Sequence, residues 1–161
     1  MSDRLRVGTG FDAHAFGQDR RLVLAGVEIP HSHGLVGHSD ADLVAHAVTD
    51  ALLGAAGGED IGRLFPSDDP SLEGASSVEL LGRAWADLHS AGWRIVNVDA
   101  IVIMQQPRLA PYRDAMRAAL ATALGVGPER VTVRASTTDH LGFVGRGEGA
   151  ACQAVVLLRR P

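Results

Sequence analysis

Lysine is absent from the sequence, and all fifteen basic residues are arginine. This excludes enzymes that use a Schiff-base lysine and nucleotide-binding loops that need a P-loop lysine. Cysteine is almost absent, since Cys152 is the single one. The chain therefore cannot form an internal disulfide or a thiolate-rich metal site. Phosphate recognition would fall to arginine, and a metal would be held by histidine and carboxylate side chains.

The sequence also lacks a basic excess and a long apolar run. Its formal net charge is −4 at pH 7, so we expect no nucleic-acid partner. The longest apolar segments, such as residues 100–104, are far shorter than the roughly 20 residues of a membrane-spanning helix. We therefore expect no membrane partner. The first residues show no signal-peptide pattern, and the predicted location is the cytoplasm.

The residues that are present predict a single α+β domain over residues 1–161, with 46% hydrophobic residues for its core. Strands are predicted over residues 4–12, 21–29, 96–104, 131–134 and 150–158, the first two as a pair. Helices are predicted between Ser39 and Gly57, between Ser76 and Gly92, and from Pro111 to Gly125. This order favours a two-layer sandwich, in which three helices pack on one face of a mixed sheet.

A candidate metal site lies near the end of the first predicted strand. Asp12 and His14 are two residues apart and therefore point the same way, while His46 follows Asp42 by one helical turn. A carboxylate and two imidazoles suit zinc, and three protein ligands leave a position open for catalysis. An Asp-x-His pair is also common in hydrogen-bonded loops. Asp42 equally fits the third helical position of a capping box that begins at Ser39.

Two loops are candidates for ligand binding. Residues 59–75 contain prolines, glycines and acidic residues without a clear period, which predicts an irregular loop of a length that is often functional. Residues 136–139 offer hydroxyls and a carboxylate before a glycine-rich stretch with Arg146, a composition that can cradle phosphate and a metal. The same residues are also ordinary strand-end and turn formers.

Two other function classes stay open on these residues. A non-catalytic zinc protein would use the same three ligands as a brace, although a structural site normally has four ligands and we find no fourth. A dinucleotide-binding oxidoreductase would use Gly8-x-Gly10-x-x-Ala13. That fingerprint must open a helix, whereas here the chain is predicted to continue into a second strand.

Five ordered stretches carry a more specific signal. They are RVGTGFDAHAF at 6–16, HSDADLVAH at 38–46 with TDALLGA at 49–55, DIG at 60–62, FPSD at 65–68 and LGFVGRGEG at 141–149. Over nearly its whole length the chain thereby resembles the 2-C-methyl-D-erythritol 2,4-cyclodiphosphate synthase family. The resemblance implies a lyase of the non-mevalonate isoprenoid precursor pathway. Its reaction closes 4-diphosphocytidyl-2-C-methyl-D-erythritol 2-phosphate to the 2,4-cyclodiphosphate and releases CMP.

The resemblance also implies cofactors and an assembly. Asp12, His14 and His46 would bind zinc or another divalent transition metal. Magnesium or manganese would accompany the substrate diphosphate, with Asp139 as its protein ligand. The assembly would be a homotrimer with active sites between subunits. His38 and Thr137 would be catalytic, because both would steady the transition state.

The substrate-binding residues that the resemblance implies fall into three groups. Near the diphosphate they are Asp12, His14, His38 and Ser39. Around the methylerythritol phosphate they are Asp60, Ile61, Gly62, Phe65, Pro66, Ser67, Asp68 and Asp69. At the cytidine end they are Met104, Gln105, Gln106, Pro107, Arg108, Leu109, Ala110, Ser136, Thr137, Thr138 and Asp139, followed by Phe143 and Arg146.

The chain departs from the family pattern at four of its positions. The family often has lysine at Arg108, threonine at Ser136 and glutamate at Asp139, and each replacement alters reach or donor geometry. Some relatives carry an acidic residue at Gln153, which the resemblance places near the threefold axis. An amide there would change how a central cavity binds a ligand.

Overall fold

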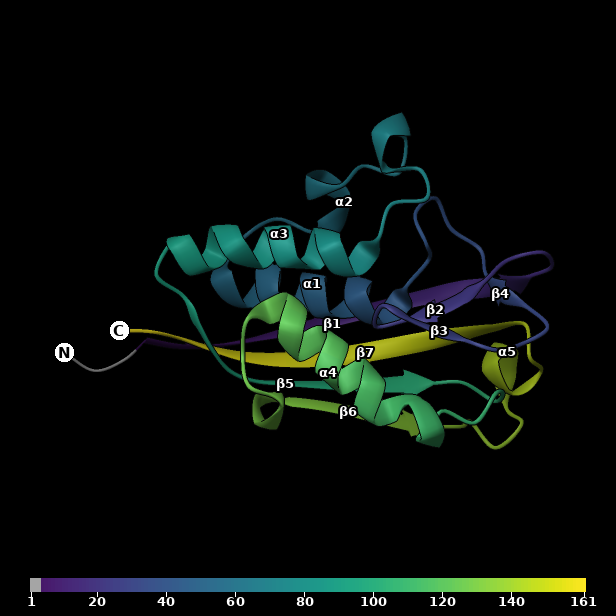
Figure 1. Ribbon diagram of the computed structural model, residues 1–161. Helices are drawn as coiled ribbons and strands as arrows, with labels where there is room; N and C mark the ends of the chain where they lie inside the picture. Colours follow the sequence, from purple (N-terminus) through teal and green to yellow (C-terminus); the bar gives the residue numbers. More distant parts are fainter. Residues whose placement is uncertain (1–3) are drawn as a thin grey trace.

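The structure, a computed structural model, describes residues 4–161 and places a five-stranded sheet at the centre of the fold (Figure 1). Its strands are β1 (Arg4–Gly17), β4 (Gly34–Leu35), β5 (Arg94–Ile103), β6 (Val131–Ser136) and β7 (Gly149–Arg160), in the order β4-β1-β7-β5-β6. β5 and β6 are parallel, and the other neighbours are antiparallel. The mixed sheet and the α+β class predicted from the sequence are confirmed.

Helices pack against this sheet and against one another. They are α1 (Leu43–Ala56), α2 (Ile61–Leu64), α3 (Ser77–Ser90), α4 (Arg113–Leu124) and α5 (Gly142–Gly145), with the 3₁₀ turns η1 (Pro70–Leu72), η2 (Ala110–Tyr112) and η3 (Pro128–Arg130). α1 contacts β1 and β7, α4 contacts β6, and α3 contacts α1 and α4. The core lies between α1, α4 and the inward side chains of β5, β6 and β7.

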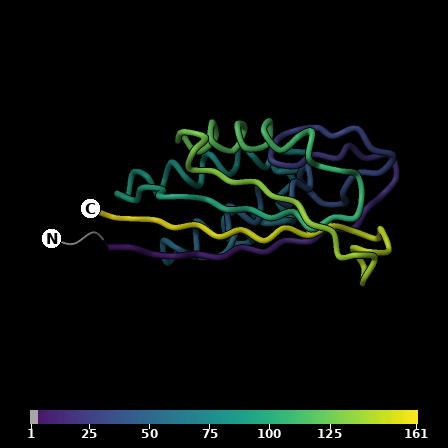
Figure 2. The backbone as a smooth tube through the Cα atoms, turned by 90° about the horizontal axis from the view of Figure 1, so that it is seen from below, coloured from purple at the N-terminus to yellow at the C-terminus, as the bar shows by residue number. Residues whose placement is uncertain are grey.

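The opposite side of the sheet carries exposed apolar side chains. In the view from below, β1 and β7 lie in front of α1, and α4 lies beside the strands along the top of the picture (Figure 2). Leu5, Val7 and Phe11 of β1 are 60%, 65% and 59% exposed, and Val155 of β7 is also exposed. Alternation along the strands produces this pattern, since every second residue of β1 points away from α1. The result is an apolar surface of a kind that marks interaction sites.

The predicted pairing of the first two strands is wrong. β1 pairs with β7 and β4, whereas residues 22–29 fold on themselves as a separate hairpin of β2 (Leu22–Leu24) and β3 (Val27–Ile29). The reason is a tight turn at Ala25 and Gly26, whose φ angles are 52° and 75°. Positive φ at both central residues matches a two-residue hairpin turn.

The predicted helices are present with small shifts at their ends. Gly57 ends α1 in the left-handed conformation, and Ser76 caps α3 by accepting from the backbone of Glu79, as the sequence predicts. α4 begins at Arg113 instead of Pro111, because Pro111 lies in η2. Residues 59–75 are largely irregular but contain the single turns α2 and η1. Within residues 4–161, every helix is too short or too polar to cross a bilayer.

Candidate metal centre and adjoining cavity

The close packing of α1 on β1 positions the three candidate ligands. A Cβ atom on Gly10 would lie 1.9 Å from the carbonyl oxygen of Ala47, so glycine is required for the helix to lie this near the strand. Asp12 and His14 follow on the same face of β1, because side chains of a strand alternate. His46 precedes Ala47 on α1 and is brought over this end of the strand.

Gly8 has the same role as Gly10, since its Cβ would meet the carbonyl oxygen of Ala51 at 2.0 Å. Both glycines lie inside β1, and no helix begins after them before residue 43. The glycine pattern that could have indicated a dinucleotide site therefore serves strand–helix packing.

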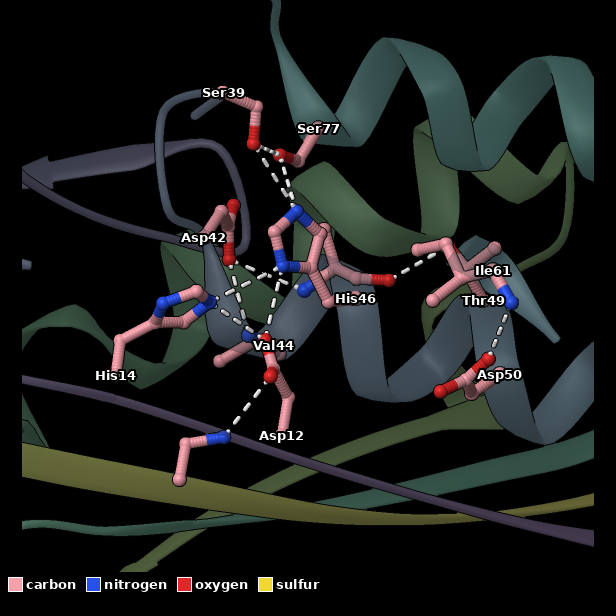
Figure 3. A network of polar contacts seen from close by, with 12 residues as sticks. Asp12, His14, Ser39, Asp42, Val44, His46, Thr49, Asp50, Ile61 and Ser77 are labelled. Carbon is pink, nitrogen blue, oxygen red and sulfur yellow. Dashed lines mark hydrogen bonds and ion pairs between the residues drawn. The ribbon is translucent and has the colours of Figure 1, made fainter. Parts of the chain in front are cut away.

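The three ligand atoms converge on one point (Figure 3). Asp12 Oδ2 lies 2.9 Å from His14 Nε2 and 2.9 Å from His46 Nδ1, and the two nitrogens are 3.4 Å apart. Ligands at zinc distances in a tetrahedron are roughly 3.3 Å apart. An ion would therefore need to spread these atoms by only a few tenths of an ångström. Within residues 4–161, these three side chains form the one group that could hold a metal.

The ring nitrogens that face away from this point are already hydrogen-bonded. His14 Nδ1 donates to the carbonyl oxygen of Val36 at 2.8 Å. His46 Nε2 lies 2.8 Å from Ser77 Oγ and 3.3 Å from Ser39 Oγ. Each imidazole thus has one occupied nitrogen and one directed at Asp12. One carboxylate and two imidazoles suit a borderline divalent metal. The hydrogen bonds to the far ring nitrogens set the orientation of the rings, as is usual for metal-binding histidines.

The electrostatics of the cluster favour an ionised carboxylate. Burial raises the pKa of Asp12, but hydrogen bonds from His14 and His46 outweigh it and lower that pKa to about 2. The hydrogen bond with Asp12 in turn raises the pKa of His14. Asp12 is therefore charged at neutral pH and available as a ligand, while a proton competes with a metal for His14.

Asp42 is a structural residue at the start of α1. It is the helix N-cap and not the third helical residue, so the capping box expected from Ser39 is wrong. Its buried carboxylate accepts backbone N–H bonds from Ala25, Gly26, Val44 and Ala45 at 2.7 to 3.2 Å. Burial raises the pKa of Asp42 to about 6. Asp42 thus joins the β2–β3 hairpin to the helix that carries His46.

A cavity of about 520 Å³ adjoins the three ligands. Of the residues implied for the substrate, it is lined by Asp12, His14, His38, Ser39, Ile61, Gly62, Phe65, Pro66, Ser67 and Asp68. Asp60 and Asp69 do not line the cavity, but they stabilise the segment that forms its wall. Asp60 caps α2 through the backbone N–H of Arg63, and Asp69 accepts from Ser71. His38 Nε2 donates to the carbonyl oxygen of Asp69 at 2.8 Å, which fastens this loop.

The residues implied for cytidine gather elsewhere, around a second cavity of about 250 Å³. This cavity is lined by Met104, Gln105, Pro107, Arg108, Leu109, Ala110, Ser136 and Thr137, and shares no lining residue with the first. The neighbouring loop is fastened internally. Asp139 N donates to Thr137 Oγ1, Thr138 Oγ1 donates to the carbonyl oxygen of Leu141, and His140 N donates to Gln105 Oε1.

Five residues implied for this end line neither cavity: Thr138 and Asp139 of that loop, and also Gln106, Phe143 and Arg146. Gln106 and Arg146 line a third cavity beside His31 and His33, and Arg146 is paired with Glu148 at 2.7 Å. Phe143 is exposed at the start of α5.

The sequence interpretation missed two polar residues of the first cavity. Asp50 follows His46 by one helical turn and accepts from the backbone N–H of Ile61 at 2.8 Å. Its spacing from His46 could have indicated it. Ser77 lies on α3, 31 residues from His46, and its contact depends on tertiary packing that no local pattern reports.

Comparisons with known proteins place the chain in a family. The model of the YgbB family matches residues 5–159. A relative from Ralstonia pickettii (strain 12J), named 2-C-methyl-D-erythritol 2,4-cyclodiphosphate synthase, is 54% identical over 97% of this chain and 93% of its own length. The solved Plasmodium falciparum IspF, described as a CDP complex, has a TM-score of 0.85 at 30% identity over 99% of both chains. The bifunctional IspDF from Campylobacter jejuni has a TM-score of 0.95 at 43% identity, and this chain spans 43% of its length.

Fold and site together define an α+β protein with three residues, Asp12, His14 and His46, that could hold a metal beside a cavity. The chain belongs to the YgbB family, that of the 2-C-methyl-D-erythritol 2,4-cyclodiphosphate synthases, and is an enzyme of that family. The resemblance inferred from the sequence is confirmed.

Proposed function

We propose that the enzyme is a metal-dependent lyase that converts 4-diphosphocytidyl-2-C-methyl-D-erythritol 2-phosphate to 2-C-methyl-D-erythritol 2,4-cyclodiphosphate. An oxygen of the 2-phosphate attacks the β-phosphorus, and the bond from that phosphorus to the bridging oxygen breaks, so that CMP leaves. The convergence of Asp12, His14 and His46 beside a cavity, in a member of this family, is the observation that carries the proposal.

The residues have two kinds of role: some would hold the metal that neutralises charge, and others position the substrate. Both reacting groups are anionic, so a divalent ion held by Asp12, His14 and His46, zinc by preference, supplies the charge neutralisation that phosphoryl transfer requires. His38 and Ser39 orient the diphosphate at this end. The wall formed by residues 60–69 holds the methylerythritol phosphate in line for attack, which is the larger part of catalysis in an intramolecular reaction.

The cytidine end is assigned to the second cavity, around residues 104–110 and 136–139. Arg108 binds phosphate there, Thr137 steadies the transition state, and Asp139 is the protein ligand of a magnesium or manganese ion that travels with the diphosphate. Phe143 and Arg146 complete that end.

We further propose a homotrimer, in which the metal centre of one subunit faces the cytidine cavity of the next. The two cavities share no lining residue within one chain, and a substrate bound between two subunits would reach one cavity from each. The uncovered face of the sheet, with Leu5, Val7 and Phe11, supplies an apolar contact surface. The single domain and the cytoplasmic location expected from the sequence remain predictions.

Metal analysis combined with a CMP-release assay tests the function. Wild-type protein is expected to hold one zinc ion per chain and to release CMP with formation of the cyclic diphosphate. His46→Ala should lose nearly all of both. His89→Ala is a matched control, because His89 lies on α3 against Trp85 and outside the first cavity.

The outcomes separate the alternatives. CMP release by a zinc-free His46→Ala variant would end the metal-dependent proposal. A wild-type protein that retains zinc but never releases CMP would instead favour the metal as a structural brace.

A further inference from the structure

A chain of hydrogen bonds leads away from the metal centre through His46 to the start of α3 (Figure 3). Ser77, the first residue of α3, is 1% exposed, and its Oγ lies 2.8 Å from His46 Nε2. Asp40 lies on the other side of Ser77. Its Oδ1 accepts from Ser77 Oγ at 2.5 Å and from the backbone N–H of Asp42, and its Oδ2 accepts from the backbone N–H of Ser77.

The chemistry of these groups fixes the direction of each bond. An ionised carboxylate only accepts, so the hydroxyl proton of Ser77 points to Asp40. Ser77 Oγ is then left with lone pairs towards His46, and His46 Nε2 must donate. An imidazole that binds a metal is neutral and has one N–H, so with Nε2 donating to Ser77 it would present the Nδ1 lone pair to an ion held beside Asp12 Oδ2, which lies 2.9 Å away.

We propose that Ser77, oriented by Asp40, is a positioning residue that holds His46 in the tautomer able to bind the metal through Nδ1. The inference rests on the metal centre of the proposed function and extends it to a residue of another helix. Ser39 reinforces the arrangement without replacing it. Its Oγ is 3.3 Å from His46 Nε2 and 3.1 Å from Ser77 Oγ, to which it can donate.

Ser77 contacts His46 from a different helix. It belongs to α3, whereas His46 belongs to α1, so the ligand is fixed from the side opposite to Asp12 and His14. The orientation of a metal-binding histidine depends on such a partner on its far nitrogen, and loss of that partner commonly weakens metal binding.

Zinc affinity measured by chelator competition, without substrate, tests the inference. Ser77→Ala should raise the zinc dissociation constant by about 10- to 100-fold. Ser76→Ala is the matched control, since Ser76 caps the same helix through Glu79 but does not contact His46. Ser77→Thr keeps the hydroxyl and should restore most of the affinity. Circular dichroism establishes that each variant is folded.

The tautomer itself is measured on zinc-loaded wild-type protein by long-range ¹H–¹⁵N correlation spectra of ¹⁵N-histidine, with His46 assigned by comparison with His46→Ala. The expected result is a proton on Nε2. A proton on Nδ1 would overturn the inference even if Ser77→Ala failed to fold.

The remaining outcomes are equally decisive. Folded Ser77→Ala that binds zinc as tightly as Ser76→Ala would overturn the positioning role and leave the proposed function intact. A wild-type protein that binds no divalent metal would remove the metal centre, and this inference with it. Failure of CMP release alone would count against the proposed function only.

Discussion

Gly10 of β1 lies directly against Ala47 of α1, and a Cβ atom at Gly10 would approach the carbonyl oxygen of Ala47 to 1.9 Å. Because that atom belongs to helix backbone, an added methyl group must push α1 away from β1. His46 precedes Ala47, so such a shift would separate His46 from Asp12 and His14. The fold and the candidate metal site therefore depend on the same contact.

We predict that Gly10→Ala lowers the free energy of unfolding by about 3 kcal/mol, at the upper end of the usual cost of overpacking. It should also weaken zinc binding, because its effect reaches His46. Urea unfolding and chelator competition measure the two effects.

Gly54→Ala is the matched control for this prediction. Gly54 is an exposed residue of α1, and its added Cβ would meet only the carbonyl oxygen of Thr9, at 3.9 Å. Replacement of a helical glycine there should stabilise the protein by up to about 1 kcal/mol. If both alanine variants shifted stability equally, close packing at Gly10 would not be the cause.

The Asp12–His14 pair predicts how the stability of the metal-free protein depends on pH. Burial raises the pKa of Asp12, but hydrogen bonds from the two histidines bring it to about 2, below its ordinary 3.8. Its stabilising contribution is thus present above pH 3.8 and is lost as the pH falls towards 2. The pKa of His14 is raised above 6.5 by its bond to Asp12, so its contribution is complete below pH 6.5 and is lost as the pH rises through the raised value.

Urea unfolding across the pH range should therefore show the largest contribution of the pair between about pH 4 and 6.5, on the order of 1 kcal/mol after allowance for solvent screening. In Asp12→Asn, the stability should no longer fall with pH because of this pair, either below pH 3.8 or above pH 6.5. Excess zinc should remove the loss of stability at high pH, because zinc competes with the proton on His14 and binds better when His14 is deprotonated. An unchanged pH profile in Asp12→Asn would show that the pair does not contribute.

Two of the three candidate ligands, Asp12 and His14, could be predicted to lie together because their spacing in a strand determines it. Two-residue alternation in a strand places Asp12 beside His14, and that rule needs no knowledge of the partner element. The signal that α1 would cover this strand was also present, in Gly8 and Gly10, but the same letters fit a dinucleotide fingerprint. Only the packing in the structure decides between the two.

The features that could not be predicted from the sequence depend on an unusual backbone conformation or on contacts between distant residues. The β2–β3 hairpin depends on a positive φ at Ala25. Alanine rarely adopts this conformation, so an alanine in the sequence does not predict a turn. Ser77 reaches His46 only because α3 begins beside α1. Contacts of this kind are set by the packing of whole elements, and residue patterns do not encode them locally.

Asp50 is predicted to hold the wall of the first cavity. Its Oδ1 accepts from the backbone N–H of Ile61 at 2.8 Å, and it is the tie between α1 and the start of α2. Asp50→Ala should leave that amide without its partner, a loss of about 1 to 3 kcal/mol that would loosen residues 61–64. The KM in the CMP-release assay should rise about tenfold, while zinc affinity should stay near the wild-type value.

Hydrogen exchange at the Ile61 amide provides the direct readout, and its protection should be lost in Asp50→Ala. Glu59→Ala is the control, because it removes only the exposed ion pair between Glu59 and Arg63 in the same segment. Comparable effects of the two variants would show that the segment is held by its surface and not by Asp50.

Mixed assemblies of two inactive variants test whether each active site is shared between two subunits. His46→Ala disables the metal half of a site, and a variant with both Arg108→Ala and Thr137→Ala disables the cytidine half. If each site joins halves from two neighbouring subunits, every trimer that contains both variants has one site of its three, about a third, with both halves intact. Co-expression with two affinity tags, followed by tandem purification, yields the mixed assemblies for the CMP-release assay.

Each variant alone should be inactive, and the mixture should regain activity near that fraction. Co-expression of His46→Ala with Asp12→Ala is the control, because both changes fall in the same half and no intact site can form. The measured fraction does not depend on how tightly the uncovered face of the sheet associates, since only assemblies that carry both tags are assayed. Inactive mixtures of the first pair would mean that one chain builds the whole site, and both the shared site and the role assigned to the second cavity would have to be given up.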